Sequence, residues 1–398
     1  MKSNYLVYHD GCLDGFLSGM VAYYKAKFFG VKNLVVLPAN YADTPVKPSN
    51  VESVTLVDFS YPMDILTELA FNGIHVTVVD HHKTFIDSFL QYDDSIQHKS
   101  VMETKYPERG QDHILKYHPV NGRPLFADVS VMNRNGRDTK FEFYLNNNEV
   151  KDKNSEYVHS GASLCFHIAT SETTGEGVKQ LLLDKTKGEI SELIRLARIH
   201  DLWIHKGDEM SDAYALSHWF KKFHKANRDL IDEMKEFPDL SSVIFEQLLE
   251  KFNADTLAFK IKEAKEELES INEKLEALAT SDAVKDVQLN HYHPDGAKIC
   301  YVDSDEVRSL GISIVGSYMT RKKGWDVAIM NAFTDEEKHV YSLRSNESTT
   351  NVDVAAICNN YFKDEKAVSG GGHTNAAGVA FTKDKKDAFF SVLSKNLI

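Results

Sequence analysis

Apolar runs and stretches of helical periodicity alternate along the first 90 residues. The runs at 5–8, 34–37, 54–57 and 74–79 are rich in β-branched side chains, which is typical of strands buried on both faces of a parallel sheet. Between them, residues 16–24 and 65–70 have the composition of helices. The alternation predicts an α/β domain with a doubly wound, mainly parallel sheet and helices on both faces.

The pattern changes between about residues 95 and 156, where the chain is polar and broken by Pro107, Pro119 and Pro124. Asn133–Arg137 precede an alternating run from Lys140 to Tyr144, which predicts a hairpin. We interpret this segment as an insertion. It either caps a functional site or is a surface excursion without a functional role.

Helical patterning resumes at residue 160 and dominates from 205 to 285. Apolar residues there step by three and four in alternation, which is a heptad seam, at Ile261, Ala264, Leu268, Ile271, Leu275 and Leu278. The seam predicts a connecting helix packed on its neighbours, and homodimer formation through it is the alternative. A second, smaller α/β unit follows, with strands expected at 298–302, 326–332 and 340–343. These shifts divide the chain into residues 1–204, a helical linker at 205–290 and a C-terminal domain at 291–398.

Composition restricts the function classes. The chain has 398 residues, and its net charge of −13 argues against a protein that coats long nucleic acid. Its four cysteines form no CxxC pair, so neither a disulfide framework nor a zinc ribbon is indicated. No signal-peptide pattern and no apolar run of membrane-spanning length occurs, so we expect a cytoplasmic protein without a membrane partner.

Acidic and imidazole side chains stand where the predicted strands end. Because parallel strands present their carboxyl ends at one edge of a sheet, these side chains are expected to meet there. One such Asp is usually a helix cap or a turn residue, but carboxylates packed together repel unless a cation lies between them. The set predicts a metal site and comprises His9, Asp14, Asp58, Asp80, His81, His82 and Asp201.

The ligand types indicate which ions would bind. Oxygen and imidazole ligands suit Mn²⁺, Mg²⁺ or Fe²⁺, and Zn²⁺ stays open. Five or six ligands exceed the needs of one ion, so we expect two bridged ions. Such a pair activates a water and stabilises the attacking and leaving oxygens of a phosphoryl group.

A second candidate site lies near the C-terminus. Gly370, Gly371 and Gly372 would let backbone N–H groups approach an anion, and His373 could donate to a phosphate; a flexible turn is the alternative. Arg344 closes a predicted strand and could bind a phosphate in a bidentate way, although a surface Arg is equally compatible with the local sequence.

The motifs described above, taken in their order along the chain, resemble those of the DHH phosphoesterase superfamily with its DHH-associated C-terminal domain. That group includes RecJ-type exonucleases, nanoRNases and cyclic-dinucleotide phosphodiesterases, and family II inorganic pyrophosphatases share its first domain. The matching blocks span nearly the whole chain: His9–Gly15, Asp58, Asp80-His81-His82, Asp201, Ser342–Ser345, Asp353–Ala355 and Gly370–Gly378.

The resemblance implies two divalent metal ions, usually Mn²⁺, in a DHH catalytic domain at 1–204. Asp58 would bridge the ions and His9 would hold the first. Asp14, His81 and Asp201 would hold the second.

The resemblance also implies roles for the remaining residues. His82 would face the scissile phosphate, and Asp80 would orient the histidines. Arg344 and His373, with the glycine loop at 370–372, would grip substrate from the C-terminal domain. The active site would then lie in a cleft between the two α/β domains.

One block departs from the family pattern. Many members carry Asp-x-Asp in the first loop, where this chain has Cys12-Leu13-Asp14. Either Cys12 replaces the first carboxylate, or Asp10 turns in, or the first ion is held more weakly. A thiolate ligand would favour softer ions.

The expected function is a hydrolase of the nanoRNase or exonuclease type. It would be a divalent-metal-dependent phosphodiesterase that cleaves short single-stranded oligonucleotides with a metal-activated water, and duplex DNA is not an expected partner. A cyclic dinucleotide or another signalling nucleotide is the alternative substrate, and a non-catalytic nucleotide sensor is the alternative from another class. No Walker-type loop supports an ATPase or kinase.

Overall fold

The computed structural model describes residues 2–82, 85–89, 125–146, 158–171, 175–286, 298–346, 349, 352–358, 369–396, apart from positions 42, 48, 87, 133–134, 136–137, 203, 205–206, 335–337 and 374 within these ranges. The chain divides into two compact units, Met1–Lys265 and Glu266–Ile398. Most of the polar segment at 95–156 lies outside the described residues, so its predicted capping role does too. Across the part of the chain that the structure describes, no helix has the length and apolar character needed to cross a bilayer.

The first unit is built on a mainly parallel sheet, as predicted. Its strands are ordered β2-β1-β3-β4-β6-β5, and only β5 runs antiparallel to its neighbour. The predicted hairpin at 133–144 is the β5–β6 pair, and β6 adds to the sheet in parallel beside β4. The strands are β1 (Ser3–His9), β2 (Leu34–Ala39), β3 (Val51–Val57), β4 (His75–Asp80), β5 (Leu125–Met132) and β6 (Asp138–Leu145).

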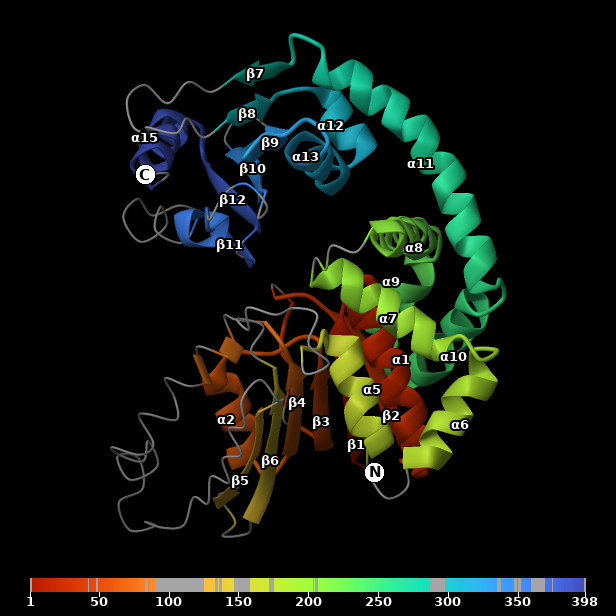
Figure 1. The fold of residues 1–398 in the computed structure, drawn as a ribbon. Helices are drawn as coiled ribbons and strands as arrows, with labels where there is room; N and C mark the ends of the chain where they lie inside the picture. The colour runs from red at the N-terminus through yellow and green to blue at the C-terminus, as the bar shows by residue number, and fades with distance from the viewer. Residues whose placement is uncertain are drawn as a thin grey trace. The chain divides into compact units, whose positions relative to one another are not determined.

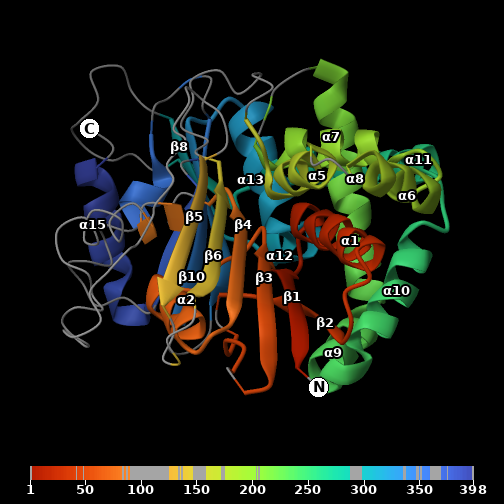
Figure 2. The same cartoon turned by 90° about the horizontal axis from the view of Figure 1, so that it is seen from below.

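Helices cover both faces of this sheet, which confirms the predicted doubly wound class (Figures 1 and 2). Helix α2 (Met63–Phe71) covers one face, where Leu66 and Leu69 pack with Val54, Val76 and Phe143 in a fully buried cluster. Helices α1 (Leu13–Phe28) and α5 (Gly161–Ser171) cover the other face and contact each other. Burial of these apolar side chains supplies most of the stabilisation.

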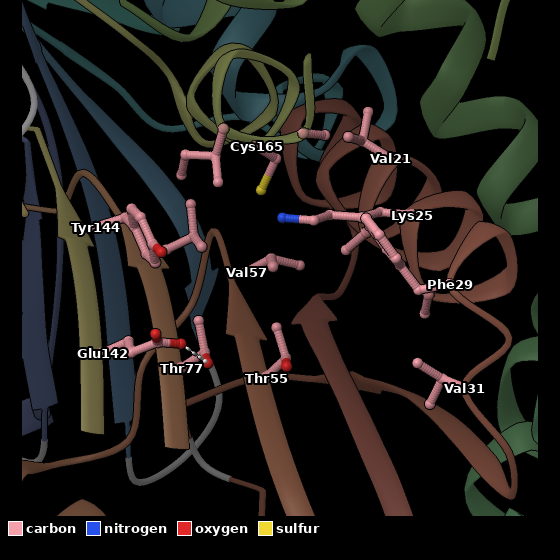
Figure 3. Close-up of a pocket in the computed structure, with 15 residues that line it drawn as sticks. Val21, Lys25, Phe29, Val31, Thr55, Val57, Thr77, Glu142, Tyr144 and Cys165 are labelled. Carbon is pink, nitrogen blue, oxygen red and sulfur yellow. Dashed lines mark hydrogen bonds between the residues drawn. The ribbon is translucent and has the colours of Figure 1, made fainter. Parts of the chain in front are cut away.

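The helical layer leaves a cavity of about 320 Å³ between α1, α5 and the sheet (Figure 3). Val57 forms part of its floor, and Lys25 of α1 points into it. Thr77 donates a hydrogen bond to Glu142 at 3.3 Å on the sheet side. Cys165 of α5 closes one end. Burial, with the nearby carboxylates, raises the pKa of this thiol, which disfavours its thiolate form.

The helices that follow residue 171 pack with the first unit as far as Lys265. Helices α9 and α10 lie against β2, and α6 and α7 lie against α1. The compact units therefore do not divide at residue 204, where composition suggested a boundary. These helices are α6 (Gly175–Lys185), α7 (Ile190–Asp201), α8 (Gly207–Ala226), α9 (Arg228–Glu236), η2 (Pro238–Leu240) and α10 (Ser241–Phe252).

Helix α11 (Leu257–Ala279) carries the predicted heptad seam and runs from the first unit into the second. Ala264, Leu275 and Leu278 on this seam are buried. Leu275 and Leu278 pack into the core of the second unit, as expected for a connecting helix.

The second unit has a mixed sheet ordered β11-β12-β10-β9-β8-β7, with β8 and β9 parallel and the other pairs antiparallel. The three predicted strands are β8, β9 and β10. Helices pack on both faces of the sheet. The elements are β7 (Val284–Asp286), β8 (Ile299–Val302), α12 (Asp305–Leu310), α13 (Ile312–Arg321), β9 (Val327–Thr334), β10 (Lys338–Ser345), β11 (Ser369–His373), β12 (Ala376–Thr382), η3 (Lys383–Lys385) and α15 (Lys386–Asn396).

Candidate metal centre

The carboxyl ends of β1, β3 and β4 lie side by side. Residue Tyr8 pairs with Val57, and Val57 pairs with Val79, in parallel register. His9 ends β1, Asp58 follows β3 and Asp80 ends β4. The three blocks that the sequence singled out therefore share one edge of the sheet, where ligands of open α/β folds collect.

Asp58 is the central residue of this edge. Its backbone has φ of 54°, a left-handed conformation that is costly for a residue with a side chain. Its Oδ1 lies 2.9 Å from His81 Nε2, and its Oδ2 lies 3.6 Å from His9 Nδ1. Cys12 Sγ lies 3.5 Å from the same Oδ2. Although burial opposes ionisation, the hydrogen bonds from His81 and His9 hold the pKa of Asp58 well below its usual range.

Asp14 is held by the first turn of α5. Ser160 Oγ donates to Asp14 Oδ1 at 2.6 Å, and the Ala162 backbone N–H donates to Oδ2 at 3.2 Å. Gly161 lies between these donors, and a Cβ there would lie 2.4 Å from Asp58 Oδ1. Only glycine fits this position without displacing the carboxylate. None of Ser160, Gly161 and Ala162 was predicted to support the site.

His81 joins the carboxylates of three elements. Besides Asp58, its Nε2 lies 3.4 Å from Asp201 Oδ2, at the end of α7, and 3.9 Å from Asp14 Oδ2. Burial would lower the pKa of His81, but the facing Asp201, Asp58 and Asp14 raise it to about 10. The negative charge gathered here is what a cation would neutralise.

The ligand atoms form three overlapping groups, each within 4.8 Å. Asp58 belongs to two groups and His81 to two, so the groups are contiguous. They are His9, Cys12 and Asp58; Asp58, His81 and His82; and Asp14, His81 and Asp201.

Asp80 contacts both histidines. Its Oδ1 accepts the backbone N–H groups of His81 at 2.8 Å and His82 at 3.1 Å, and His82 Nδ1 at 2.7 Å. The facing carboxylate overcomes burial and raises the pKa of His82. Asp80 is thus placed to position the His82 imidazole, as a carboxylate behind a metal-binding histidine does.

Asp10 turns away from these groups. Its carboxylate accepts His224 Nε2 at 2.8 Å and lies 3.4 Å from Arg228 Nη1 and 3.5 Å from Lys235 Nζ. Burial would raise the pKa of Asp10, but His224 and the two cations lower it. Asp10 therefore does not turn in toward the other groups, whereas Cys12 lies beside Asp58. The contact of His224 was missed, because its partner is 214 residues away.

The chemistry of these residues fits divalent metal ions. Burial, with the neighbouring Asp58 and Asp201, raises the pKa of Asp14 well above its usual range, so the Asp14 carboxylate resists ionisation in the metal-free protein. In the described part of the chain, Oδ2 of Asp201 is buried and accepts no hydrogen bond, although His81 lies nearby. The groups provide carboxylate oxygens, imidazole nitrogens and one sulfur as possible metal ligands. In the metal-free protein, burial and the neighbouring Asp58 and Asp14 raise the pKa of the Cys12 thiol.

Known structures agree with this architecture. A DHH-domain protein described as a member of the s1p family of ribosomal proteins superposes with a TM-score of 0.52 at 15% identity, over 99% of this chain and 86% of that protein. The chain has the DHH fold. RecJ of Thermus thermophilus, in complex with Mn²⁺, superposes with a TM-score of 0.50 at 15% identity, over 98% of this chain and 51% of RecJ. No family model and no curated protein matched the chain.

In the second unit of this DHH fold, the sheet aligns the predicted substrate-binding positions. Arg344 of β10 and His373 of β11 both pair with Ala376 of β12. They therefore stand at one level of the sheet, two strand spacings or about 10 Å apart. Gly370–Gly372 form part of β11, so the predicted glycine loop is wrong. These glycines lie in an edge strand, whose outer backbone groups face away from the sheet.

Arg344 is held rather than extended into solvent. Its Nη1 donates to Leu343 O at 2.8 Å and to Ser342 Oγ at 3.0 Å, and Nη2 donates to Ser313 Oγ at 3.1 Å. The Gly316 backbone of α13 also packs closely against the Arg344 side chain. The guanidinium is thus partly buried and pre-oriented, which distinguishes it from an ordinary surface Arg.

Proposed function

We propose that the protein is a divalent-metal-dependent phosphodiesterase that hydrolyses short single-stranded oligonucleotides, of the nanoRNase or exonuclease type. The observation that carries the proposal is the shared position of Asp58 between a His9–Cys12 group and the group that includes His81. A carboxylate so placed can bind two ions at once. The RecJ structure contains Mn²⁺, which supports Mn²⁺ as one of the ions to test.

The proposed ligands follow the three groups. His9, Cys12 and Asp58 would hold one ion, and Asp14, His81 and Asp201, with Asp58, would hold the other. When bound, such a pair supplies Lewis acidity for a phosphoryl centre and lowers the pKa of water.

His82 would act on the substrate. Asp80 accepts a hydrogen bond from its Nδ1, and this carboxylate raises its pKa, which favours the protonated ring that would donate to a phosphate oxygen. Negative charge develops on that oxygen in the transition state, which such a donor stabilises. Arg344, His373 and the backbone of the Gly370–Gly372 edge would bind a substrate phosphate.

A short substrate suits the overall charge. A net charge of −13 disfavours binding of a long polyanion, while Arg344 offers one oriented cation. A cyclic dinucleotide would satisfy the same groups, and a nucleotide sensor would use them without turnover.

A turnover assay separates these possibilities. We expect the purified protein with Mn²⁺ to hydrolyse di- to pentanucleotides faster than cyclic dinucleotides or pyrophosphate, with products resolved over time. Asp58→Ala and His81→Ala should abolish turnover, and His167→Ala, an exposed histidine outside the metal groups, should retain it. Tight nucleotide binding without turnover under any divalent ion would contradict the enzyme and support the sensor.

A further inference from the structure

Tyr41 is an exposed aromatic residue at the metal centre to which no role has been given above. It follows β2, and 60% of its surface is exposed. We infer that Tyr41 forms a nucleobase subsite, on which a base next to the scissile phosphate stacks. This inference deepens the proposed function and rests on it for the identity of the ligand.

The ring lies among residues of the metal centre. Its centroid is 5.7 Å from the His9 ring and 6.1 Å from the His82 ring. On the inner side it packs at 5.1 Å on Phe59, which follows Asp58 and is only 1% exposed. Tyr41 therefore has a buried aromatic support and an exposed surface, at the edge where His82 would meet a phosphate.

The turn that carries Tyr41 is fastened on both sides. The Asn40 side chain donates to Asp10 at 3.4 Å, and the Asn40 backbone N–H donates to Asp43 Oδ2 at 3.0 Å. Lys235 of α9 donates to the same Asp43 oxygen at 3.0 Å. These contacts hold Asn40, the residue before Tyr41, in place before a ligand arrives, which reduces the entropy that binding must overcome.

A stacking role explains a tyrosine at position 41 better than the alternative, that Tyr41 is an ordinary exposed aromatic residue. Single exposed aromatic residues are common and need no explanation by themselves. Here the ring borders the imidazoles of His9 and His82, and a base attached to the bound phosphate would lie within one nucleotide of it. Stacking accepts every base, because each has a π-face, so Tyr41 would select nucleotides over pyrophosphate without selecting a sequence.

The test measures binding apart from turnover. The Kd of a 5′-phosphorylated dinucleotide is determined by equilibrium dialysis with Ca²⁺ in place of Mn²⁺, and hydrolysis with Mn²⁺ is followed separately. Variants are Tyr41→Ala and Tyr41→Phe. Phe29→Ala is the matched control, since Phe29 is 48% exposed and lies one helix length, about 24 Å, from the start of α1. Dinucleotides that lack either base, and pyrophosphate, complete the ligand panel.

We expect Tyr41→Ala to weaken dinucleotide binding about 5- to 150-fold, as loss of one stacking surface does, while Tyr41→Phe and Phe29→Ala bind as the wild type does. The effect should disappear for one of the two abasic dinucleotides and for pyrophosphate, with bound metal unchanged. An unchanged Kd in Tyr41→Ala, or the same loss with every ligand, would overturn the subsite. Absence of wild-type hydrolysis with this binding pattern intact would instead overturn the phosphodiesterase alone, and absence of wild-type binding would overturn both.

Discussion

Gly161→Ala tests the metal centre without touching a ligand. Gly161 begins α5 between two groups that hold Asp14, and an added Cβ would lie 2.4 Å from Oδ1 and 2.6 Å from Cβ of Asp58. Contacts this short require a shift. Asp58 is buried and its backbone is already in a left-handed conformation, so it has little freedom to move.

The magnitude follows from two opposed effects. Alanine favours a helix over glycine by about 0.5–1 kcal/mol, but overpacking in a tight interior costs about 1–3 kcal/mol. We therefore expect a net loss of about 1–2 kcal/mol in the free energy of unfolding. Because Asp58 is shared between two ligand groups, Mn²⁺ affinity should fall about ten- to a hundred-fold, the usual cost of disturbing the support of a metal ligand.

Gly177→Ala is the matched control. A Cβ at Gly177 in α6 would meet the ring of Phe28 at 2.6 Å, but that ring is 43% exposed and can swing away. The control should therefore keep wild-type Mn²⁺ affinity and be as stable as the wild type or about 0.5–1 kcal/mol more stable.

The assay combines urea unfolding of the metal-free protein with Mn²⁺ titration calorimetry. If Gly161→Ala bound Mn²⁺ as tightly as Gly177→Ala does, the close packing of α5 on Asp58 would not control the ligand, and the reasoning above would be refuted. A stability loss without a metal effect would assign Gly161 to packing alone.

Three further predictions address other parts of the chain. Cys12→Asp keeps a good helix cap, since Cys12 now accepts the Gly15 backbone N–H at 3.2 Å, but removes the soft ligand; affinity for Cd²⁺ relative to Mn²⁺ should fall about ten-fold, as competition titrations would show. Arg344→Ala should weaken dinucleotide binding about ten- to a hundred-fold through loss of charged hydrogen bonds, while metal analysis finds the metal content unchanged; loss of metal would contradict its role in substrate binding. Lys260 is 1% exposed and donates to Asp255 O at 2.7 Å, and burial lowers its pKa from 10.5 to about 8. At a pH between these two pKa values the unfolded chain holds more protons than the folded protein, so Lys260 makes the free energy of unfolding rise with pH by up to about 3 kcal/mol. Lys260→Met should remove that rise, as unfolding of both proteins at pH 7.5 and pH 10 would measure. An equal rise in both proteins would refute the prediction.

Much of the fold was predictable because its strands are buried on both faces. A run such as residues 74–79 needs no partner to be recognised, and it forms β4 as expected. Which strands lie side by side was harder to predict from the sequence. Strands β4 and β6, for example, pair through residues far apart in the chain, such as Val76 and Phe141. The prediction for the glycines at 370–372 was wrong because it used local preference alone. Their local preference indicates a loop, but pairing with β12 makes them a strand.

The site was predictable where it follows from strand ends and not where it depends on helix packing. Asp58 and His81 could be placed together because parallel strands end at one edge. Ser160 and Gly161 come to Asp14 and Asp58 through the packing of α5, for which the only local sign is a run of small residues. Tyr41 carried no local sign, since its significance comes only from the rings around it.

The buried Asp10 has a practical consequence for anyone who trims this protein. Its partners His224, Arg228 and Lys235 all come from α8 and α9, beyond the last proposed metal ligand, Asp201. A truncated version that stopped just after that ligand would keep the full ligand set yet remove all three partners of the Asp10 carboxylate, which lies one residue from His9. The shortest fragment with an intact ion-binding loop should therefore extend through α9.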